Sequence, residues 1–201
     1  MVKQTLAGLR ILVVLTVILG VLYPLGVWLV SRIPGLEANA EGSVITKNGR
    51  PVGSSLIGID PQATDPNHDP WFHTRPSASA KDPLGQGDPS TSGGSNKAAD
   101  NLDYLGVVQQ RKDAIARREG VSPAQVPPDA VTASGSGLDP QISPAYASLQ
   151  VARVARENGL PDDVVLGLVA DNTTGRGLGV LGDPGVNVLN LNLAVQAAKH
   201  W

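Results

Sequence analysis

The chain has 201 residues, with 18 acidic and 16 basic side chains, 3% aromatic residues and no cysteine. This length is sufficient for one sizeable hydrophobic core. A slight negative excess without a basic patch gives no support to nucleic-acid binding. The lack of cysteine is compatible with either side of a membrane and therefore does not indicate a compartment.

The first distinctive segment is an uncharged apolar run at residues 11–30. A helix of this length matches the ~30 Å hydrocarbon core of a bilayer and satisfies its own backbone hydrogen bonds without water. We therefore expect a transmembrane helix at 11–30, preceded by a short N-terminus (1–10) and followed by a linker (31–41). Pro24 and Gly26 inside the run indicate a kink or a close approach to another helix.

Two alternatives to a retained anchor remain open. Lys3 and Arg10 followed by an apolar run, with small residues at Ala38 and Ala40, resemble a cleaved signal peptide. The run is longer than the 7–15 residues of a signal core, and this favours the anchor. A buried core helix is the other alternative, but the run has no polar face.

The charges that flank the run predict its orientation. Lys3 and Arg10 precede it, whereas Arg32 is followed by Glu37 and Glu41. Positive residues favour the cytoplasmic side, so we expect a cytoplasmic N-terminus. A soluble mixed α+β domain over residues 42–201 would then be extracytoplasmic.

Residues 33–99 are rich in Gly, Pro, Ser, Asp and Asn, and they predict short strands and ordered loops rather than helices. Asp-Pro pairs favour extended geometry and turns in this half. Candidate strands are 42–45 and 55–59. Disorder is the alternative for such a composition, but four apolar residues are expected as buried anchors. These are Leu56, Ile57, Trp71 and Phe72.

The second half predicts helices with recognisable start and stop residues. The expected helices run from a cap at Asp100 to about Arg118, from Ser143 and Pro144 to Gly159, from Pro161 through Val169, and from a cap at Asn187 to about Ala198. Their apolar positions near helical spacing include Leu102, Leu105, Val108, Ile115, Tyr146, Leu149, Val154 and Ala155.

Motifs of known chemistry are mostly missing from the sequence. It contains neither an Asp-Lys-Thr-Gly phosphorylation sequence nor a phosphate-binding P-loop nor a nucleophile elbow. Residues 177–182 match G-x-G-x-x-G literally but lack the following helix, so we expect a structural loop. Asp65, His68, Asp69 and His73 resemble a loose metal cluster, but they have no defined ligand spacing. We therefore predict no catalytic residue and no metal site.

Two loops combine hydroxyl groups and glycines densely enough to suggest a function. Such loops can cradle anions or lie against another backbone, because glycine leaves its amides bare. Tight turns satisfied within the domain are an equal alternative. The candidate nucleotide-contact or partner-contact residues are Ser92, Gly93, Gly94, Ser95 and Asn96 in the first loop, and Thr132, Ser134, Gly135, Ser136, Gly137 and Asp139 in the second.

Arg75 is a further candidate, as a structural clamp. It is followed by Pro76, which fixes the chain, and a guanidinium can bridge several carbonyls or a carboxylate. A ligand contact is the alternative role.

The sequence resembles the C chain of the bacterial potassium-transporting ATPase, the Kdp complex. The matching blocks are 53–58, 72–77, 92–96, 131–144 with Gln150, Arg153 and Val154 behind it, 181–184 and 186–193. Together with the N-terminal anchor they cover nearly the whole chain, and the block at 131–144 is the most specific. Two positions depart from the family pattern: Ile59 stands where a Gln is usual, and residues 97–100 replace Leu-Gly-Pro-Ser.

The resemblance implies a non-catalytic subunit of a potassium import pump in the bacterial inner membrane. Its partners would be a channel-like A chain, a P-type ATPase B chain and a small F peptide. The family is described as a catalytic chaperone that raises the ATP affinity of the B chain, so ATP is a possible ligand. A membrane-tethered sensor or substrate-binding module beside a transporter is the alternative.

Overall fold

The computed structural model describes residues 2–199 and divides the chain into two compact units, up to Pro51 and from Val52 onward. Residues 1, 200 and 201 lie outside the described residues. They belong to the predicted N-terminus (1–10) and to the predicted domain (42–201).

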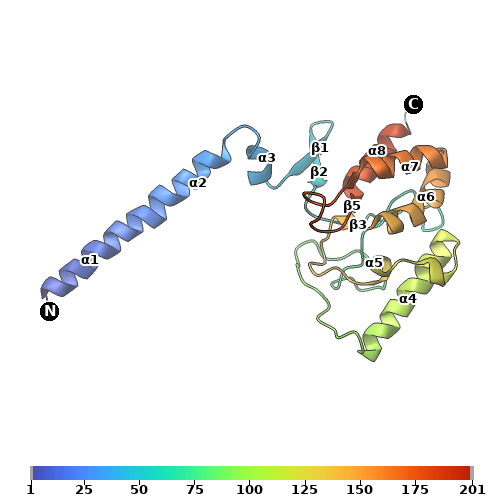
Figure 1. Ribbon diagram of the computed structural model, residues 1–201, viewed down its shortest axis with the longest axis horizontal. Helices are drawn as coiled ribbons and strands as arrows, with labels where there is room; N and C mark the ends of the chain where they lie inside the picture. Colours follow the sequence, from blue (N-terminus) through green and yellow to red (C-terminus); the bar gives the residue numbers. More distant parts are fainter. Residues whose placement is uncertain (1, 200–201) are drawn as a thin grey trace. The chain divides into compact units, whose positions relative to one another are not determined.

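The first unit begins with a long apolar helix (Figure 1). It consists of α1 (Val2–Val17), a π-helical segment (Ile18–Leu22) and α2 (Tyr23–Ser31). Together these make 30 residues, with a mean hydropathy of 2.4 in the most apolar window, which is long and apolar enough to span a bilayer. The helix begins nine residues before the uncharged run. The short α3 (Glu37–Ala40) follows.

The π-helical segment lies immediately before the proline noted in the sequence. Tyr23 N–H donates to the carbonyl of Ile18, five residues back. Pro24 has no N–H to continue the regular ladder, and wide π turns are a common adjustment at such positions.

A two-stranded sheet is formed by β1 (Val44–Lys47) and β2 (Arg50–Ser54). Asn48 and Gly49 between them both have positive φ (52° and 74°), as a two-residue hairpin turn requires. The predicted first strand overlaps β1, but the strand predicted at 55–59 is wrong. The Asn-Gly turn places the return strand immediately behind it, and pairing ends at Ser54.

The second unit contains α4 (Leu102–Glu119), a 3₁₀ turn (Pro123–Gln125), α5 (Pro128–Val131), α6 (Pro144–Asn158), α7 (Asp162–Asp171) and α8 (Val188–Ala198). The predicted helices are therefore confirmed. Ser143 caps α6 by accepting from Tyr146 N–H, and Asn187 caps α8 by accepting from Asn190 N–H.

The start of α4 differs from the prediction. Asn101, and not Asp100, is the N-cap, because its side chain accepts a hydrogen bond from Tyr104 N–H at 3.0 Å. Gly120 ends the helix at φ 70°, in the left-handed conformation that glycine tolerates. Leu102 and Leu105 near the start are exposed, whereas Ile115 is fully buried.

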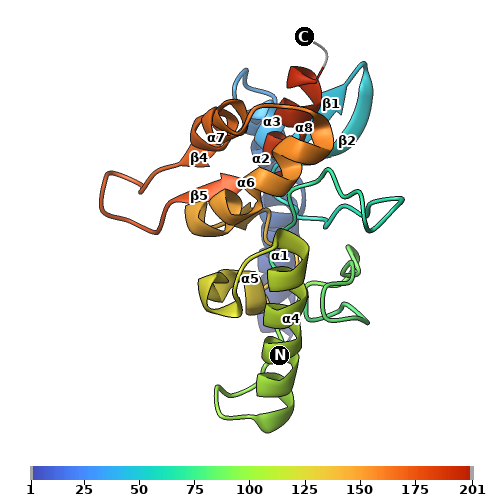
Figure 2. The same ribbon diagram turned by 90° about the vertical axis from the view of Figure 1, so that its right-hand side faces the viewer.

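A small antiparallel sheet has the strand order β3-β5-β4, with β3 at Gln141–Ile142, β4 at Thr173–Thr174 and β5 at Gly185–Asn187. Ile142 pairs with Val186, and Thr173 pairs with Val186 from the other side. The segment predicted to be a structural loop, residues 177–182, lies in the loop that joins β4 to β5 (Figure 2).

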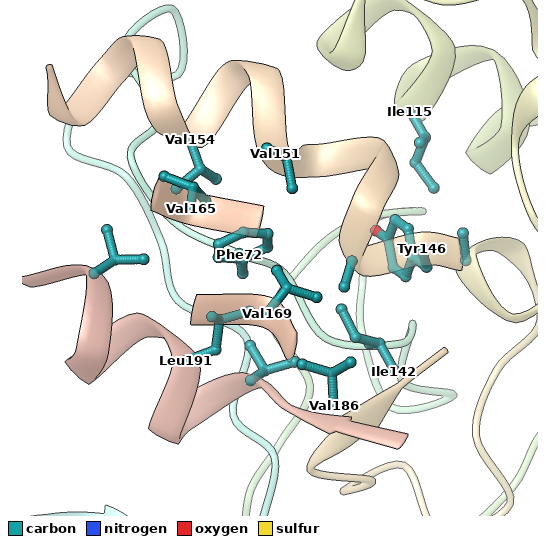
Figure 3. Packing of buried hydrophobic residues seen from close by; sticks show 14 of the residues in the cluster. Phe72, Ile115, Ile142, Tyr146, Val151, Val154, Val165, Val169, Val186 and Leu191 are labelled. Atoms are coloured by element: carbon teal, nitrogen blue, oxygen red, sulfur yellow. The ribbon is translucent and has the colours of Figure 1, made fainter. Parts of the chain in front are cut away.

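The core lies between α6, α7, α8 and this sheet, and it extends toward α4 (Figure 3). Phe72 comes from the irregular segment before α4 and is fully buried, as predicted. Leu56 and Ile57 were expected in the core, but they are exposed and this prediction is wrong. Trp71 is partly buried.

Candidate functional site

Residues 69–75 form an irregular segment whose backbone is bonded by helix side chains. The side chain of Asn192 in α8 accepts from Phe72 N–H at 2.8 Å and donates to the Phe72 carbonyl at 2.9 Å. Gln150 in α6 accepts from His73 N–H at 2.8 Å. Both amides are buried. They take the place of a neighbouring strand, because buried backbone groups must find a partner.

Arg153 of α6 makes the largest number of these contacts. Its guanidinium donates to the carbonyls of Asp69 (2.7 Å) and Trp71 (2.9 Å), to both carboxylate oxygens of Glu119 (3.0 and 3.2 Å), and to Gln150 Oε1 (3.1 Å). The Arg153 side chain is 4% exposed and that of Glu119 is fully buried. This residue therefore joins the irregular segment to α4 and α6.

His73 lies between two carboxylates. Its Nδ1 is 3.0 Å from Asp60 and its Nε2 is 2.5 Å from Asp69, and all three side chains are largely buried. Both ring nitrogens of His73 are therefore within hydrogen-bonding distance of a carboxylate oxygen. Asp60 also accepts from Thr74 N–H at 2.8 Å.

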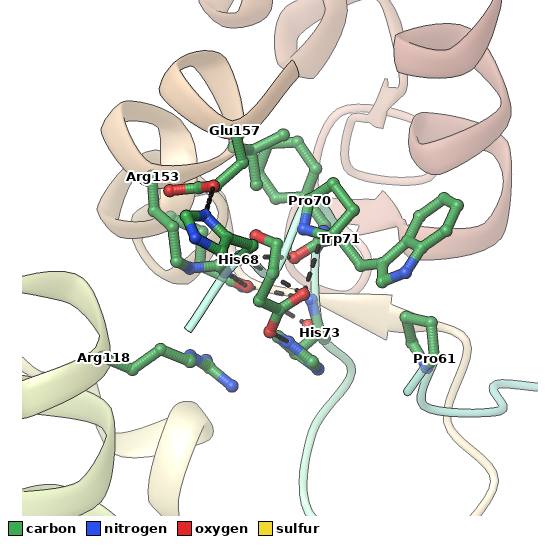
Figure 4. Close-up of polar contacts among 12 residues, drawn as sticks. Pro61, His68, Pro70, Trp71, His73, Arg118, Arg153 and Glu157 are labelled. Atoms are coloured by element: carbon green, nitrogen blue, oxygen red, sulfur yellow. Dashed lines mark hydrogen bonds and ion pairs between the residues drawn. The ribbon is translucent and has the colours of Figure 1, made fainter. Parts of the chain in front are cut away.

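The four residues weighed as a loose metal cluster do not converge. His68 pairs with Glu157 at 3.1 Å (Figure 4), while Asp69 and His73 are bonded to each other. Within residues 2–199 no group of three or more His, Asp or Glu side chains has the geometry to hold a metal ion.

Asp69 makes the stability of the domain depend on pH. Burial alone raises the pKa of Asp69, but the hydrogen bond and charge of His73, the charge of Arg153 and the Trp71 amide together lower it from 3.8 to about 2. A lowered folded-state pKa contributes stability above 3.8 that is lost as the pH falls through about 2. The contribution is about 2 kcal/mol.

We therefore expect the free energy of unfolding to fall more steeply between pH 5 and pH 2 in the wild type than in Asp69→Asn. Denaturant titrations of the two proteins at each pH give this difference, which cancels the contributions of the other carboxylates. Parallel pH profiles would show that Asp69 does not have a lowered pKa.

The two glycine-serine loops lie directly against each other. Gly93 N–H donates to the Ser136 carbonyl at 2.7 Å. A Cβ on Gly94 would lie 3.1 Å from the Gly135 carbonyl oxygen, and one on Gly137 would lie 3.0 Å from the Gly93 carbonyl oxygen. Gly137 also has a φ of 72°. The glycines at 94 and 137 therefore permit a close approach of the two backbones, whereas a Cβ on Gly135 would meet no atom within 4 Å.

Much of the second loop is bonded within the domain. Ser134 N–H donates to the Pro76 carbonyl (3.1 Å), Gly137 N–H to Ser134 Oγ (2.7 Å) and Leu138 N–H to Ser136 Oγ (3.1 Å). These amides are therefore already used, although an anion-binding loop needs amides that are free to face a ligand.

Arg75 connects to the same loop. Its Nη1 donates to Asp139 at 3.1 Å, and its Nη2 lies 3.5 Å from Thr132 Oγ1. Arg75 Nε is buried without a partner among the described residues. Arg75, Gly137 and Asp139 line a cavity of about 20 Å³. A cavity of this size has room for one water molecule and is too small for a nucleotide.

The first loop borders a larger cleft of about 360 Å³ beside α4. Ser95 and Lys97 line it together with Lys81, Asp82 and Arg111. Arg111 donates to the carbonyls of Pro83 (2.9 Å) and Val131 (3.1 Å), so its guanidinium is already bonded to the protein. Of the remaining candidates, Ser92 and Asn96 are exposed, and Asn96 has a positive φ of 51°.

Sequence reasoning did not assign roles to Gln150, Arg153 and Asn192. The two α6 residues lie on one face at the spacing of a helix turn, and each is a polar residue within a buried stripe. Polar side chains in such a stripe are bonded to buried partners, and this was the available indication.

The fold thus defines a class of protein. It has an N-terminal helix long and apolar enough to cross a membrane, followed by a mixed α/β domain in which helix side chains bond the irregular segment 69–75. The family model described as "K+-transporting ATPase, c chain" matches residues 5–197. The chain therefore belongs to the family of potassium-transporting ATPase c chains.

Similar proteins that match nearly the whole chain are named as potassium-transporting ATPase KdpC subunits. The potassium-transporting ATPase KdpC subunit of Kineococcus radiotolerans is 47% identical over 197 residues, which cover 98% of this chain and 94% of the relative. That of Polaromonas naphthalenivorans is 49% identical over 186 residues, covering 92% and 90%. That of Caldanaerobacter subterraneus subsp. tengcongensis is 42% identical over 204 residues, covering 99% and 97%.

Proposed function

We propose that the chain is a non-catalytic, membrane-anchored subunit of an ATP-driven potassium importer in the bacterial inner membrane. Its partners in this proposal are a channel-like A chain, a P-type ATPase B chain and a small F peptide. Family membership over residues 5–197 supports this role and favours it over a tethered sensor. The lack of a phosphorylation sequence supports a non-catalytic role.

In the proposed topology, residues 1–10 are cytoplasmic, 11–30 span the membrane, 31–41 form a linker and 42–201 form an extracytoplasmic domain. The support is the charge bias, since Lys3 and Arg10 precede the apolar run.

The chain acts as a catalytic chaperone through assembly rather than through direct contact with nucleotide. The observation that carries this is the junction of the two glycine-serine loops, where Gly93 bonds to Ser136 and Ser134 bonds to Pro76. Four loop amides that could otherwise face a phosphate, those of Gly93, Ser134, Gly137 and Leu138, are bonded inside the domain. A higher ATP affinity of the B chain then follows from stabilising the complex in its binding-competent state.

Nucleotide binding is a second candidate function, and the cleft that contains Lys81 and Lys97 is the place to test it. Its volume of about 360 Å³ falls within the usual range for ligand pockets. We expect calorimetry of ATP with the purified full-length chain in detergent to show no saturable binding at physiological concentrations. Saturable binding that is lost in Lys97→Ala would contradict the assembly mechanism.

The spanning helix is expected to pack against a partner helix. Apart from the adjacent backbone of the helix itself, a Cβ added at Gly20 or Gly26 would meet no described atom closer than 4.0 Å, so larger side chains fit the isolated helix. Replacing both with Leu should block close packing in the membrane and release most of the chain from the A and B chains in mild detergent.

Co-purification of the tagged chain with its partners measures this release. Gly8→Leu is the matched control, because Gly8 also has open space but lies before the apolar run. Unchanged co-purification of the Gly20/Gly26 double variant would count against helix packing as the basis of assembly.

A further inference from the structure

The loop between β4 and β5 presents an apolar surface to solvent. Residues 175–184, which we call the apolar finger, extend away from the sheet (Figure 2). Leu178 is 92% exposed, Val180 74% and Leu181 63%. These three side chains lie within four residues, and such a cluster of exposed apolar groups is typical of an interaction surface.

The apolar finger is an ordered structure held by its own contacts. Gly177 and Leu181 exchange two backbone hydrogen bonds of 2.8 Å each, and Arg176 pairs with Asp183 at 2.6 Å. Leu178 has a φ of 51°, in the left-handed region that is unfavourable for leucine. Exposure of a strained leucine contributes nothing to the domain itself, and strained positions of this kind concentrate at functional sites.

A shallow groove continues this surface onto α7. Its volume is about 550 Å³, and its lining includes Leu166, Val169 and Ala170 of α7. Gly175 and Pro184, at the base of the apolar finger, line the same groove. Leu166 is 48% exposed. The groove therefore adjoins the base of the finger at Gly175 and Pro184, and the two are taken together as one surface.

The border of this surface is acidic. Asp162 and Asp163 lie four and three residues before Leu166, on the same face of α7, and Asp171 ends the helix. All three are exposed and make no ion pair with any residue in the described range 2–199. The helix carries no basic residue, and Asp183 offsets the charge of Arg176.

We infer that the apolar finger and the α7 groove bind an apolar segment of another protein chain, bordered by lysine or arginine residues. The inference rests on the proposed function, because the partner is a chain of the same transport complex. The acidic border complements basic side chains and is repelled by the anionic headgroups of a bilayer surface. It also disfavours a second copy of this chain, whose acidic residues would meet its own.

The direct test places a photoreactive benzoylphenylalanine at position 178 of the full-length chain within the purified complex. We expect illumination to give a covalent adduct with another chain of the complex. The same amino acid at position 102 is the control, since Leu102 is 81% exposed on α4, away from the finger. Adducts formed only with lipid or only with a second copy of this chain would overturn the inference.

A second test removes the apolar contact without touching the core. Leu178→Ser combined with Leu181→Ser should weaken association with the complex by at least about tenfold, since two exposed leucines lose their burial. Asp163→Lys should weaken it further at low salt. Leu102→Ser should have no effect. Circular dichroism of each variant shows whether the domain is folded.

These outcomes separate the inference from the proposed function. Full association of the folded Leu178/Leu181 variant, together with release of the Gly20/Gly26 variant, would overturn the docking surface and leave the assembly role in place. Failure of the wild-type chain to co-purify with the A and B chains would contradict the proposed function itself.

Discussion

Replacement of Arg153 by alanine is expected to lower the free energy of unfolding by about 3–5 kcal/mol. The guanidinium is buried and bonds to Glu119, Gln150 and the carbonyls of Asp69 and Trp71. Its loss leaves the two buried carbonyls without a donor and leaves Glu119 paired with Arg118 alone. Thermal and denaturant unfolding of the full-length chain in detergent, followed by circular dichroism, measures the change.

Arg156→Ala is the matched control for this prediction. Arg156 lies one turn further along α6, with 66% of its side chain exposed and a surface ion pair to Glu157. An exposed pair of this kind contributes less than about 1 kcal/mol. Equal effects of the two substitutions would show that the Arg153 network does not hold the irregular segment in place.

Replacement of Gly58 by alanine should have the second large effect. Its Cβ would lie 2.1 Å from the carbonyl oxygen of Asp139 and 2.9 Å from the Cα of Pro140, both backbone atoms that cannot turn away. Gly58 N–H also donates to the Leu138 carbonyl at 2.8 Å. Forcing this contact apart should cost about 3 kcal/mol of stability.

Gly135→Ala is the control for Gly58→Ala. It also introduces a methyl group into this region, but Gly135 has no neighbouring atom within 4 Å of the new position. We expect its unfolding midpoint in denaturant to match that of the wild type. A Gly58→Ala protein of unchanged stability would show that the segment around Gly58 is not packed against Asp139.

Local signals in the sequence were sufficient for most helix ends. Ser143 followed by Pro144, Asn187, and the glycines at 120 and 159 act over one turn, so their chemistry is visible without knowledge of the fold. The cap of α4 was misplaced by one residue because Asp100 and Asn101 are both good caps. Only the backbone geometry at Asn101 distinguishes them.

Long-range contacts were not predictable in the same way. Asn192 bonds to Phe72 across 120 residues, and Gln150 bonds to His73 across 77. These contacts depend on how α6 and α8 pack, which hydrophobic spacing does not specify. Leu56 and Ile57 were mispredicted for the same reason. They are apolar, and nothing in the sequence indicated that they lie outside the core.

The two glycine-serine loops were predictable from the sequence only in part. Their glycine and serine content indicated close backbone approach, but the sequence could not identify the approaching partner. In the structure the two loops meet each other, through Gly93 and Ser136, and Arg75 joins the second loop through Asp139. The β4–β5 loop was recognised as a loop, but its exposed apolar tip required the structure.

We propose that the domain lies outside the cytoplasm and acts on the B chain through assembly. The chain contains no cysteine, so a single introduced cysteine reports its own location. Ala99→Cys places one at an exposed position in the domain, and Lys3→Cys places one before the apolar run. A membrane-impermeant maleimide applied to intact spheroplasts should label Ala99→Cys, and should label Lys3→Cys only after lysis. Labelling of Lys3→Cys in intact spheroplasts, with Ala99→Cys protected until lysis, would contradict the proposed extracytoplasmic domain.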